Sequence, residues 1–284
     1  MIGRALWLAT VAALGGCASA AAPQSSAPGR PTIVSLNPCT DAVLAEVADP
    51  AQVLAISHYS KNPRSSSMDV ASAARFPATG GTAEEVAALK PDLVIAGTFL
   101  APATRAALAR MGIRVATVGI ASNVEQSLTQ VREVAALAGQ PERGEQVARR
   151  IERALAAAAP PAGAALIPAV MWQSGGIVPG ENSLVGDMMR RTGFSSHSAA
   201  RGLKQADHLP LERMLADPPR VIFAAGSADS GADSGDDRML SHPALGALAG
   251  TRYARFDPAL LYCGGPTLAH AAARLAQVRA EVSP

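Results

Sequence analysis

The chain has 284 residues, of which 49% are hydrophobic and 17% charged, a composition typical of a globular protein with one large or two moderate domains. Its 25 basic and 23 acidic residues leave a net charge of +2. This balance lacks the basic field that typifies nucleic-acid-binding proteins, so we expect no nucleic acid among its partners.

The first residues predict an export signal over residues 1–20. Arg4 precedes an apolar run over residues 5–14, which is too short to cross a bilayer as an ordinary helix. Residues 21–30 are rich in Ala, Pro and Ser and show no periodicity, which predicts a linker. Export places the protein in an oxidising compartment, where disulfides form.

Two processing sites compete within this signal. Residues 14–17, Leu-Gly-Gly-Cys, resemble a lipoprotein box that would place a lipid on Cys17. Residues 18–20, Ala-Ser-Ala, fit a small-residue cleavage site instead. The mature protein is therefore expected either to be anchored to a membrane through Cys17 or to be released in soluble form.

Strands and helices alternate from residue 33 onward and predict an N-terminal α/β lobe over residues 31–120. The strand runs are short and apolar, and the intervening segments have helix caps or helix stops. We expect strands at 33–36, 53–56, 93–96 and 115–118, and helices at 40–47 and 103–111.

Two amphipathic stretches predict connecting helices over residues 121–160. Their apolar residues recur at helical spacing, with Arg and Glu on the other face. One of the two is expected to be a long interlobe helix that holds the lobes nearly rigid; the alternative is two ordinary surface helices. The stripes are Val124, Leu128, Val131 and Ala135, then Val147, Ile151 and Leu155.

The second half, residues 161–284, repeats the design of the first. Glu84 is followed seven residues later by Pro91 and then by four apolar residues, and Glu212 precedes Pro219 and another apolar run at the same offsets. Unalternated apolar runs suit strands that are covered on both faces. The fold class predicted is thus α/β, with two Rossmann-like lobes, a long rigid interlobe helix and a ligand cleft between the lobes.

The usual signatures of catalysis and nucleotide binding are missing from the sequence. It contains no phosphate-binding loop, no dinucleotide fingerprint and no nucleophile elbow. We therefore expect no enzyme and no cofactor; a secreted or lipid-anchored hydrolase that uses Ser174 or His58 is the alternative. No resident metal is expected either, unless folding gathers Cys39, His58 and Cys263. The two cysteines could be bridged, free or soft ligands.

Residues 82–95 and the closing Gly-Pro-Thr-Leu helix at 265–268, together with the export signal, resemble the periplasmic binding proteins of iron-chelate and cobalamin ABC importers. The resemblance covers nearly all of the chain after residue 31. It implies a monomer in the periplasm that captures a small metal chelate and delivers it to a membrane permease. It also implies two lobes joined by one long helix.

The cobalamin-binding members of that family offer the nearest likeness. Residues 57–60, Ser-His-Tyr-Ser, resemble a turn whose tyrosine lines the corrinoid pocket, which makes Tyr59 a pocket residue. Residues 260–266 depart from those members, which have a Trp-Phe pair there; Tyr262 is expected to replace the missing aromatic face. The resemblance implies a cobalamin or other corrinoid first, a ferric siderophore close behind, and haem after these.

The family docks on its permease through one exposed glutamate on each lobe, and motif position assigns this role to Glu84 and Glu212. A carboxylate is favoured at a helix N-terminus by the helix dipole, and arginines of a partner bind carboxylates in forked pairs. The alternative is that both acids serve only to start their helices.

Ligands of doubly wound lobes bind beyond the carboxyl ends of the strands. Aromatic side chains there suit a large planar ligand, and Arg64 could hold its carboxylates or phosphate. Trp172 has a core position at the end of a strand as its alternative. The predicted ligand-binding residues are Cys39, His58, Tyr59, Arg64, Trp172, Tyr262 and Cys263.

Overall fold

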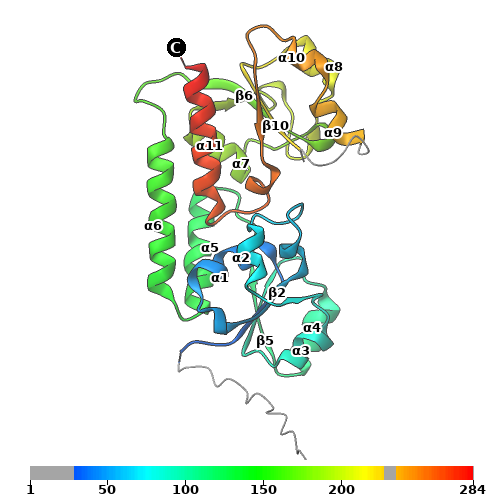
Figure 1. Ribbon diagram of the computed structural model, residues 1–284, viewed down its shortest axis with the longest axis vertical. Coiled ribbons are helices and arrows are strands. Elements are labelled where there is room, and N and C mark those ends of the chain that lie inside the picture. The colour runs from blue at the N-terminus through cyan, green and yellow to red at the C-terminus, as the bar shows by residue number, and fades with distance from the viewer. Residues whose placement is uncertain (1–28, 227–234, 284) are drawn as a thin grey trace, which may run out of the picture.

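The computed structural model describes residues 29–226 and 235–283. The predicted export signal, Cys17 and nearly all of the predicted linker lie outside the described residues. Two α/β lobes lie one above the other, with long helices along one side of both (Figure 1). Among the described helices, none is long and apolar enough to cross a membrane.

The N-terminal lobe contains a five-stranded parallel sheet in the order β3-β2-β1-β4-β5. The predicted strands and helices of this lobe are all present, with ends that differ by a few residues. The strands are β1 Ile33–Ser35, β2 Val53–Ser57, β3 Ala78–Thr79, β4 Leu93–Gly97 and β5 Arg114–Val118; the helices are α1 Pro38–Val47, α2 Val70–Ala74, α3 Ala83–Leu89 and α4 Pro102–Arg110.

The C-terminal lobe contains a four-stranded parallel sheet in the order β11-β10-β6-β8, and a small antiparallel pair β7-β9. The strands are β6 Ile167–Gln173, β7 Ile177–Val178, β8 Phe194–Ser196, β9 Asp207–His208, β10 Val221–Ala225 and β11 Arg252–Phe256. The helices are α7 Leu184–Arg191, α8 Leu211–Ala216, α9 Gly235–Leu240, α10 Pro243–Gly246 and α11 Thr267–Val282.

Helices α5 (Val124–Leu137) and α6 (Pro141–Ala158) connect the two lobes. α6 has 18 residues, a length of about 27 Å at the usual rise per residue. It packs against α1 and α5 at one end and against α11 of the C-terminal lobe at the other (Figure 1). The predicted interlobe helix is therefore confirmed.

A glycine allows α5 and α6 to lie close together. A side chain at Gly144 would place its Cβ only 2.4 Å from the Cβ of Ala135 on α5. That separation is far inside van der Waals contact, so a larger residue would push the two helices apart. The connection between the lobes is thus a tightly packed helix pair.

Successive side chains of a strand point to opposite faces of its sheet, so each sheet has two sets of apolar side chains. The faces turned toward α1, α5, α6 and α11 share one continuous core, which includes Ile95, Ile151 and Phe223 from the two lobes and α6. The opposite faces have their own smaller cores, one in each lobe. Because burial stabilises apolar surface by about 25 cal/mol per Å², a wide hinge motion that opened the shared core would be costly.

Candidate functional site

A cavity of about 1010 Å³ lies between the lobes. Its walls come from the ends of strands in both lobes, from α5, and from the loops on either side of α7. The residues that form its polar walls include Asn37, Ser122, Gln130, Glu181, Asn182, Ser183, Lys204 and Gln205, and Tyr262 adds an aromatic ring. Met171, Phe256 and Leu268 contribute apolar surface.

The topology explains why the cavity lies there. Asn37 follows β1, Ile120 follows β5 and Tyr262 follows β11, and all three line the cavity. In parallel sheets the carboxyl ends of the strands share one edge, so the loops that follow them meet. The side chain of Asn37 also caps α1, accepting a 2.7 Å hydrogen bond from the backbone N–H of Cys39.

The charge of the cavity walls is balanced. Among the described residues that line it, Glu181 is the acidic side chain and Lys204 the basic one. Amides supply further polarity and also fix the loops: Gln130 donates a 3.0 Å hydrogen bond to the carbonyl of Gly119, and Gln205 accepts one of 2.7 Å from the N–H of Gly180. The walls therefore combine apolar surface with neutral hydrogen-bonding groups.

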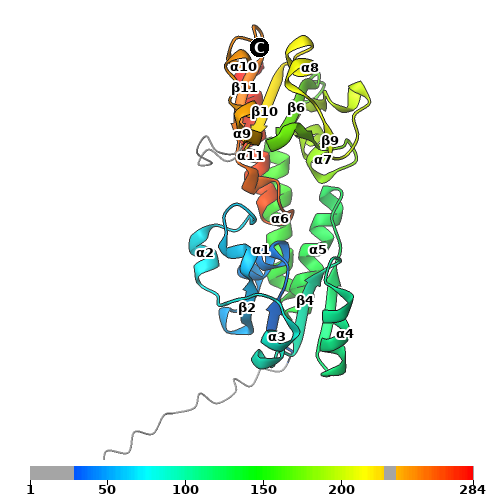
Figure 2. The same cartoon turned by 90° about the vertical axis from the view of Figure 1, so that its right-hand side faces the viewer.

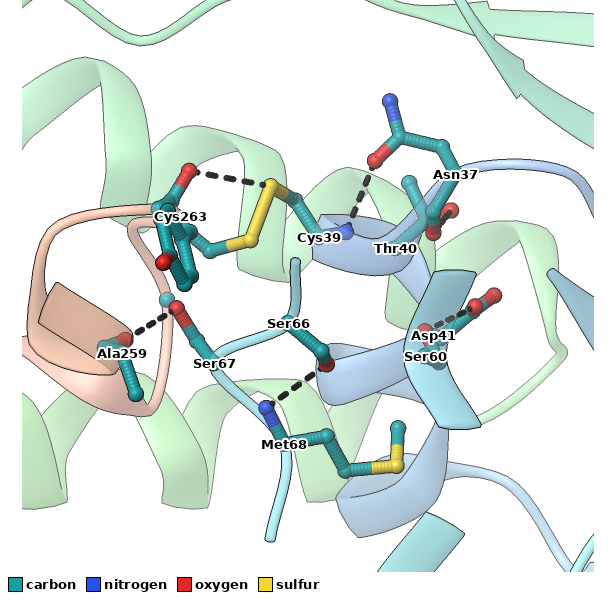
Figure 3. The surroundings of a disulfide bond; sticks show 12 residues. Asn37, Cys39, Thr40, Asp41, Ser60, Ser66, Ser67, Met68, Ala259 and Cys263 are labelled. Atoms are coloured by element: carbon teal, nitrogen blue, oxygen red, sulfur yellow. Dashed lines mark hydrogen bonds between the residues drawn. A yellow bond between two sulfur atoms is a disulfide. The ribbon is translucent and has the colours of Figure 1, made fainter. Parts of the chain in front are cut away.

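Cys39 and Cys263 form a disulfide across the cleft, with their Cα atoms 5.2 Å apart (Figure 3). The sequence alone is compatible with bridged, free or ligand-binding cysteines. The alternative prediction of a metal site formed by Cys39, His58 and Cys263 is wrong, because disulfide sulfurs are not the thiolates that bind metals. The described residues also contain no group of three His, Cys, Asp or Glu side chains arranged to hold a metal ion.

His58 and Tyr59 lie together in a short 3-10 turn, His58–Lys61, directly after β2. Their ring centroids are 4.1 Å apart, and Tyr59 is 55% exposed. The two residues are not among those that line the cavity described above. They lie at the same carboxyl edge of the N-terminal sheet as Asn37 and Ile120, which do line the cavity.

Asp41 is a buried residue of the site region that sequence reasoning missed. Its Oδ2 accepts hydrogen bonds from the N–H of Ser57 at 3.0 Å and the hydroxyl of Ser60 at 2.6 Å, which hold the turn that carries Tyr59. Burial raises the pKa of Asp41 to about 7, although the hydrogen bonds act to lower it. Its Oδ1 is buried without a partner. An acid followed by Ala-Val-Leu on one short helix was the available signal.

Trp172 does not belong to the site, so its prediction as a ligand residue is corrected. The side chain is fully buried with Val170 and Ile222 in the smaller core of the C-terminal lobe, on the sheet face away from the shared core; we call this the outer core. Its indole N–H donates a 2.9 Å hydrogen bond to the carbonyl of Leu209. Strand alternation places Trp172 on the same face of β6 as Val170, away from the cavity.

Arg64 is exposed in the loop after the turn of Tyr59, and it is not among the residues that line the cavity.

Large apolar side chains are exposed at the carboxyl ends of the N-terminal strands. Tyr59 follows β2, Phe99 follows β4 and is 87% exposed, and Ile120 follows β5 and is 68% exposed. Ile120 was not predicted, because a single apolar residue in the loop between β5 and α5 carries no sequence signal of its own. Together these side chains give the carboxyl edge of the N-terminal sheet exposed apolar surface, and of the three Ile120 lines the cavity.

Glu84 and Glu212 occupy equivalent positions in the two lobes. Each is exposed and is the second residue of its helix, α3 or α8. Both helices lie on the side of the molecule away from α6 (Figure 1), the side turned toward the viewer in Figure 2. The neighbouring Glu85 instead accepts hydrogen bonds from Thr79 and from the N–H of Gly80.

The family model for periplasmic binding proteins matches residues 33–255. The chain belongs to this family. Periplasmic binding proteins of this kind capture substrates for ABC importers rather than catalyse reactions, and they work in the periplasm. The resemblance inferred from the sequence is thereby confirmed.

Several solved structures have similar folds. The haem-binding protein HutB of Vibrio cholerae superposes with a TM-score of 0.69 at 17% identity, covering 87% of this chain and 97% of that chain. The vitamin B12 binding protein BtuF of the same organism gives 0.65 at 18% identity, covering 89% and 98%. The haem-binding protein RhuT of Roseiflexus sp. RS-1 gives 0.64 at 20%, covering 89% and 98%. No curated protein sequence matches the chain.

Proposed function

We propose that this periplasmic binding protein captures a metal chelate with a tetrapyrrole ring, a corrinoid before haem, and delivers it to an ABC permease. The observation that carries the proposal is the interlobe cavity of about 1010 Å³ with apolar surface and neutral polar walls. A volume near 1,000 Å³ is at the upper end for small-molecule sites and accommodates a large macrocycle.

The charge of the walls favours a corrinoid over haem. Most side chains of a corrinoid end in amides, whereas haem carries two carboxylates. Gln130, Asn182 and Gln205 offer amide partners, and Glu181 offsets the single Lys204. Two carboxylates in such a cavity would lack the excess of cations that usually binds them.

A second candidate is haem or a ferric siderophore, which the His58–Tyr59 pair favours. An imidazole and a phenol lie side by side in the turn after β2, and both groups are iron ligands in haem proteins. Several of the similar folds are also named as haem-binding proteins. A ligand that occupies the interlobe cavity is therefore expected to be a corrinoid, whereas a ligand that contacts His58 and Tyr59 is expected to be haem or a ferric siderophore.

The test is an absorption spectrum of purified protein after mixing with cyanocobalamin, haemin or a ferric hydroxamate and removing free ligand. Retention of the corrinoid bands supports the first choice. Retention of haem or of the iron chelate keeps the capture role and replaces corrinoid as the ligand. Retention of none of the three would contradict the proposal.

We further propose that Glu84 and Glu212 dock the protein on arginines of its permease. Their equivalent exposed positions on the two lobes support this role. Partner arginines bind carboxylates in forked, charge-assisted pairs. A permease in the membrane would contact one side of the protein, which also accounts for the position of the two glutamates on the same side.

A further inference from the structure

We propose that the Cys39–Cys263 disulfide is a positioning element of the ligand cleft: it fixes residues 257–265 of the C-terminal lobe to the N-terminal lobe. We call these residues the cleft segment. The part of the proposal that concerns ligand affinity rests on the function proposed above, whereas the part that concerns the fixing of the cleft segment stands without it.

The cleft segment connects β11 to α11, so by chain order it is part of the C-terminal lobe. Five of its residues line the interlobe cavity: Leu260, Leu261, Tyr262, Cys263 and Gly264. Tyr262 is 41% exposed there. The placement of this segment therefore decides the shape of one wall of the cavity.

The cleft segment is held from outside its own lobe at three points along its length. Near its start, the hydroxyl of Ser67 donates a 2.5 Å hydrogen bond to the carbonyl of Ala259. Cys263 is joined to Cys39 at the start of α1 (Figure 3). Near its end, the N–H of Gly265 donates a 2.7 Å hydrogen bond to the hydroxyl of Ser127 on α5.

The sequence of the segment is suited to this close approach. A Cβ at Gly264 would lie 2.4 Å from the hydroxyl oxygen of Ser127, and Gly265 has a φ of +64°, a conformation that favours glycine. The sulfur of Cys39 also lies 3.5 Å from the carbonyl oxygen of Tyr262. Because a disulfide sulfur carries no hydrogen, this is a packing contact, and it places the bond directly against the backbone of the cavity wall.

The disulfide differs from the two hydrogen bonds in one respect that matters for binding. The hydrogen bond from Ser67 is partly buried and the one to Ser127 is buried; either can break and re-form as the protein fluctuates, whereas the covalent bond does not open thermally. A wall that is already fixed costs less entropy to order around a ligand. We therefore expect the disulfide to slow ligand dissociation by keeping the Tyr262 wall in place.

The first experiment needs no ligand. Hydrogen exchange is measured by mass spectrometry on wild-type protein and on the Cys39→Ser/Cys263→Ser double variant, both free of ligand. We expect the amides of the cleft segment to exchange at least tenfold faster in the variant, while those of β1, β4, β6 and β10 keep their rates. Unchanged exchange in the cleft segment would overturn the proposal, whatever the protein binds.

The second experiment measures the dissociation rate of whichever tetrapyrrole the wild-type protein retains, cyanocobalamin or haemin. We expect dissociation to be at least tenfold faster from the double variant. Faster exchange with an unchanged dissociation rate would refute the role in binding. If the wild-type protein retains neither compound, the proposed function fails and the exchange comparison still decides whether the disulfide fixes the segment.

Chemical reduction can replace the double variant, and a second variant serves as a control. If the double variant does not fold, folded wild-type protein is treated with dithiothreitol, which closes to its own cyclic disulfide and leaves Cys39 and Cys263 as two thiols. Cys39 is partly exposed and accessible to the reagent. The matched variant Ser67→Ala removes one hydrogen bond from the same segment but keeps the disulfide; its exchange should rise only near Ala259. An equal rise along the whole segment would contradict the primary role of the disulfide.

Discussion

At the residue scale, the least expected side chain is Asp41, a carboxyl group with no exposed surface. It holds the turn of Tyr59 through Ser57 and Ser60. Burial raises its pKa to about 7, so between the ordinary value and pH 7 the folded protein keeps a proton that the unfolded chain has released. The free energy of unfolding must then fall as pH rises through this interval.

The variant Asp41→Asn tests this directly, because an amide cannot ionise. Relative to the variant, we expect the wild-type protein to lose roughly 3 kcal/mol of stability between pH 5 and pH 8, since each pKa unit corresponds to about 1.4 kcal/mol. Urea unfolding of both proteins at the two pH values measures the difference. A difference between the two proteins that is the same at both pH values would show that Asp41 does not titrate in this range.

Substitution of Tyr59 tests whether this residue contacts the ligand. Its exposed ring can pack on a planar ligand, and aromatic contacts contribute about 1 kcal/mol beyond area burial. We expect Tyr59→Ala to weaken binding of the retained tetrapyrrole at least tenfold in a fluorescence or absorbance titration, without a change in thermal midpoint. Met111→Ala, which removes an exposed apolar side chain at the end of α4, is the control and should bind normally. Equal affinities for both variants would remove Tyr59 from the site.

Residue types alone could not place every aromatic side chain. Tyr59 closely follows a predicted strand and Trp172 ends one, yet Tyr59 is exposed and Trp172 is fully buried. The difference comes from strand alternation, which assigns Trp172 to the outer core, and from Asp41, which holds the turn of Tyr59 at the sheet edge. The first could have been inferred from Val170 two positions earlier; the second depends on a contact between distant segments.

At the element scale, the sequence predicted the helices well but not each start. Ser122 and Glu125 have the spacing of a capping box, yet α5 is capped by Asn123, whose side chain accepts from the N–H of Gln126. The neighbouring Asn-x-x-Gln pair fits equally well. The choice is made by Asp187 of α7, which accepts a 3.0 Å hydrogen bond from the N–H of Val124 and which no local pattern reveals.

The contact between α5 and α6 depends on the absence of a side chain at Gly144. We expect Gly144→Leu to destabilise the protein by about 2 kcal/mol or more, because overpacking a tight contact forces the helices apart. The control Ala157→Leu places the same side chain on an exposed position of α6 and should change stability by less than about 0.5 kcal/mol. Urea unfolding compares them; similar losses in both would argue against a tight helix contact at Gly144.

At the scale of the whole molecule, the repeat of acid, proline and apolar run was enough to predict two related lobes. It could not predict that their inner faces share one core through α6, since that depends on how α1, α5 and α11 pack on one another. Nor could spacing alone decide whether two cysteines separated by 224 positions would meet. Both features follow from the way the lobes are stacked.

Docking on a permease is a property of the whole molecule, because it requires both lobes at once. We expect the double variant Glu84→Lys/Glu212→Lys to abolish ligand uptake by cells that contain the cognate permease, since each reversed charge would face an arginine. Ligand affinity of the purified variant should be unchanged, because neither residue lines the cavity.

Glu142→Lys is the matched control for this prediction. Glu142 is also exposed and is also the second residue of its helix, α6, but α6 lies on the opposite side of the molecule from α3 and α8 (Figure 1). The loss of the interaction between an acid and the helix dipole is therefore the same in kind. Uptake that fails in the double variant and persists with Glu142→Lys assigns the effect to the docking side. Normal uptake by the double variant would leave Glu84 and Glu212 as helix-starting residues and nothing more.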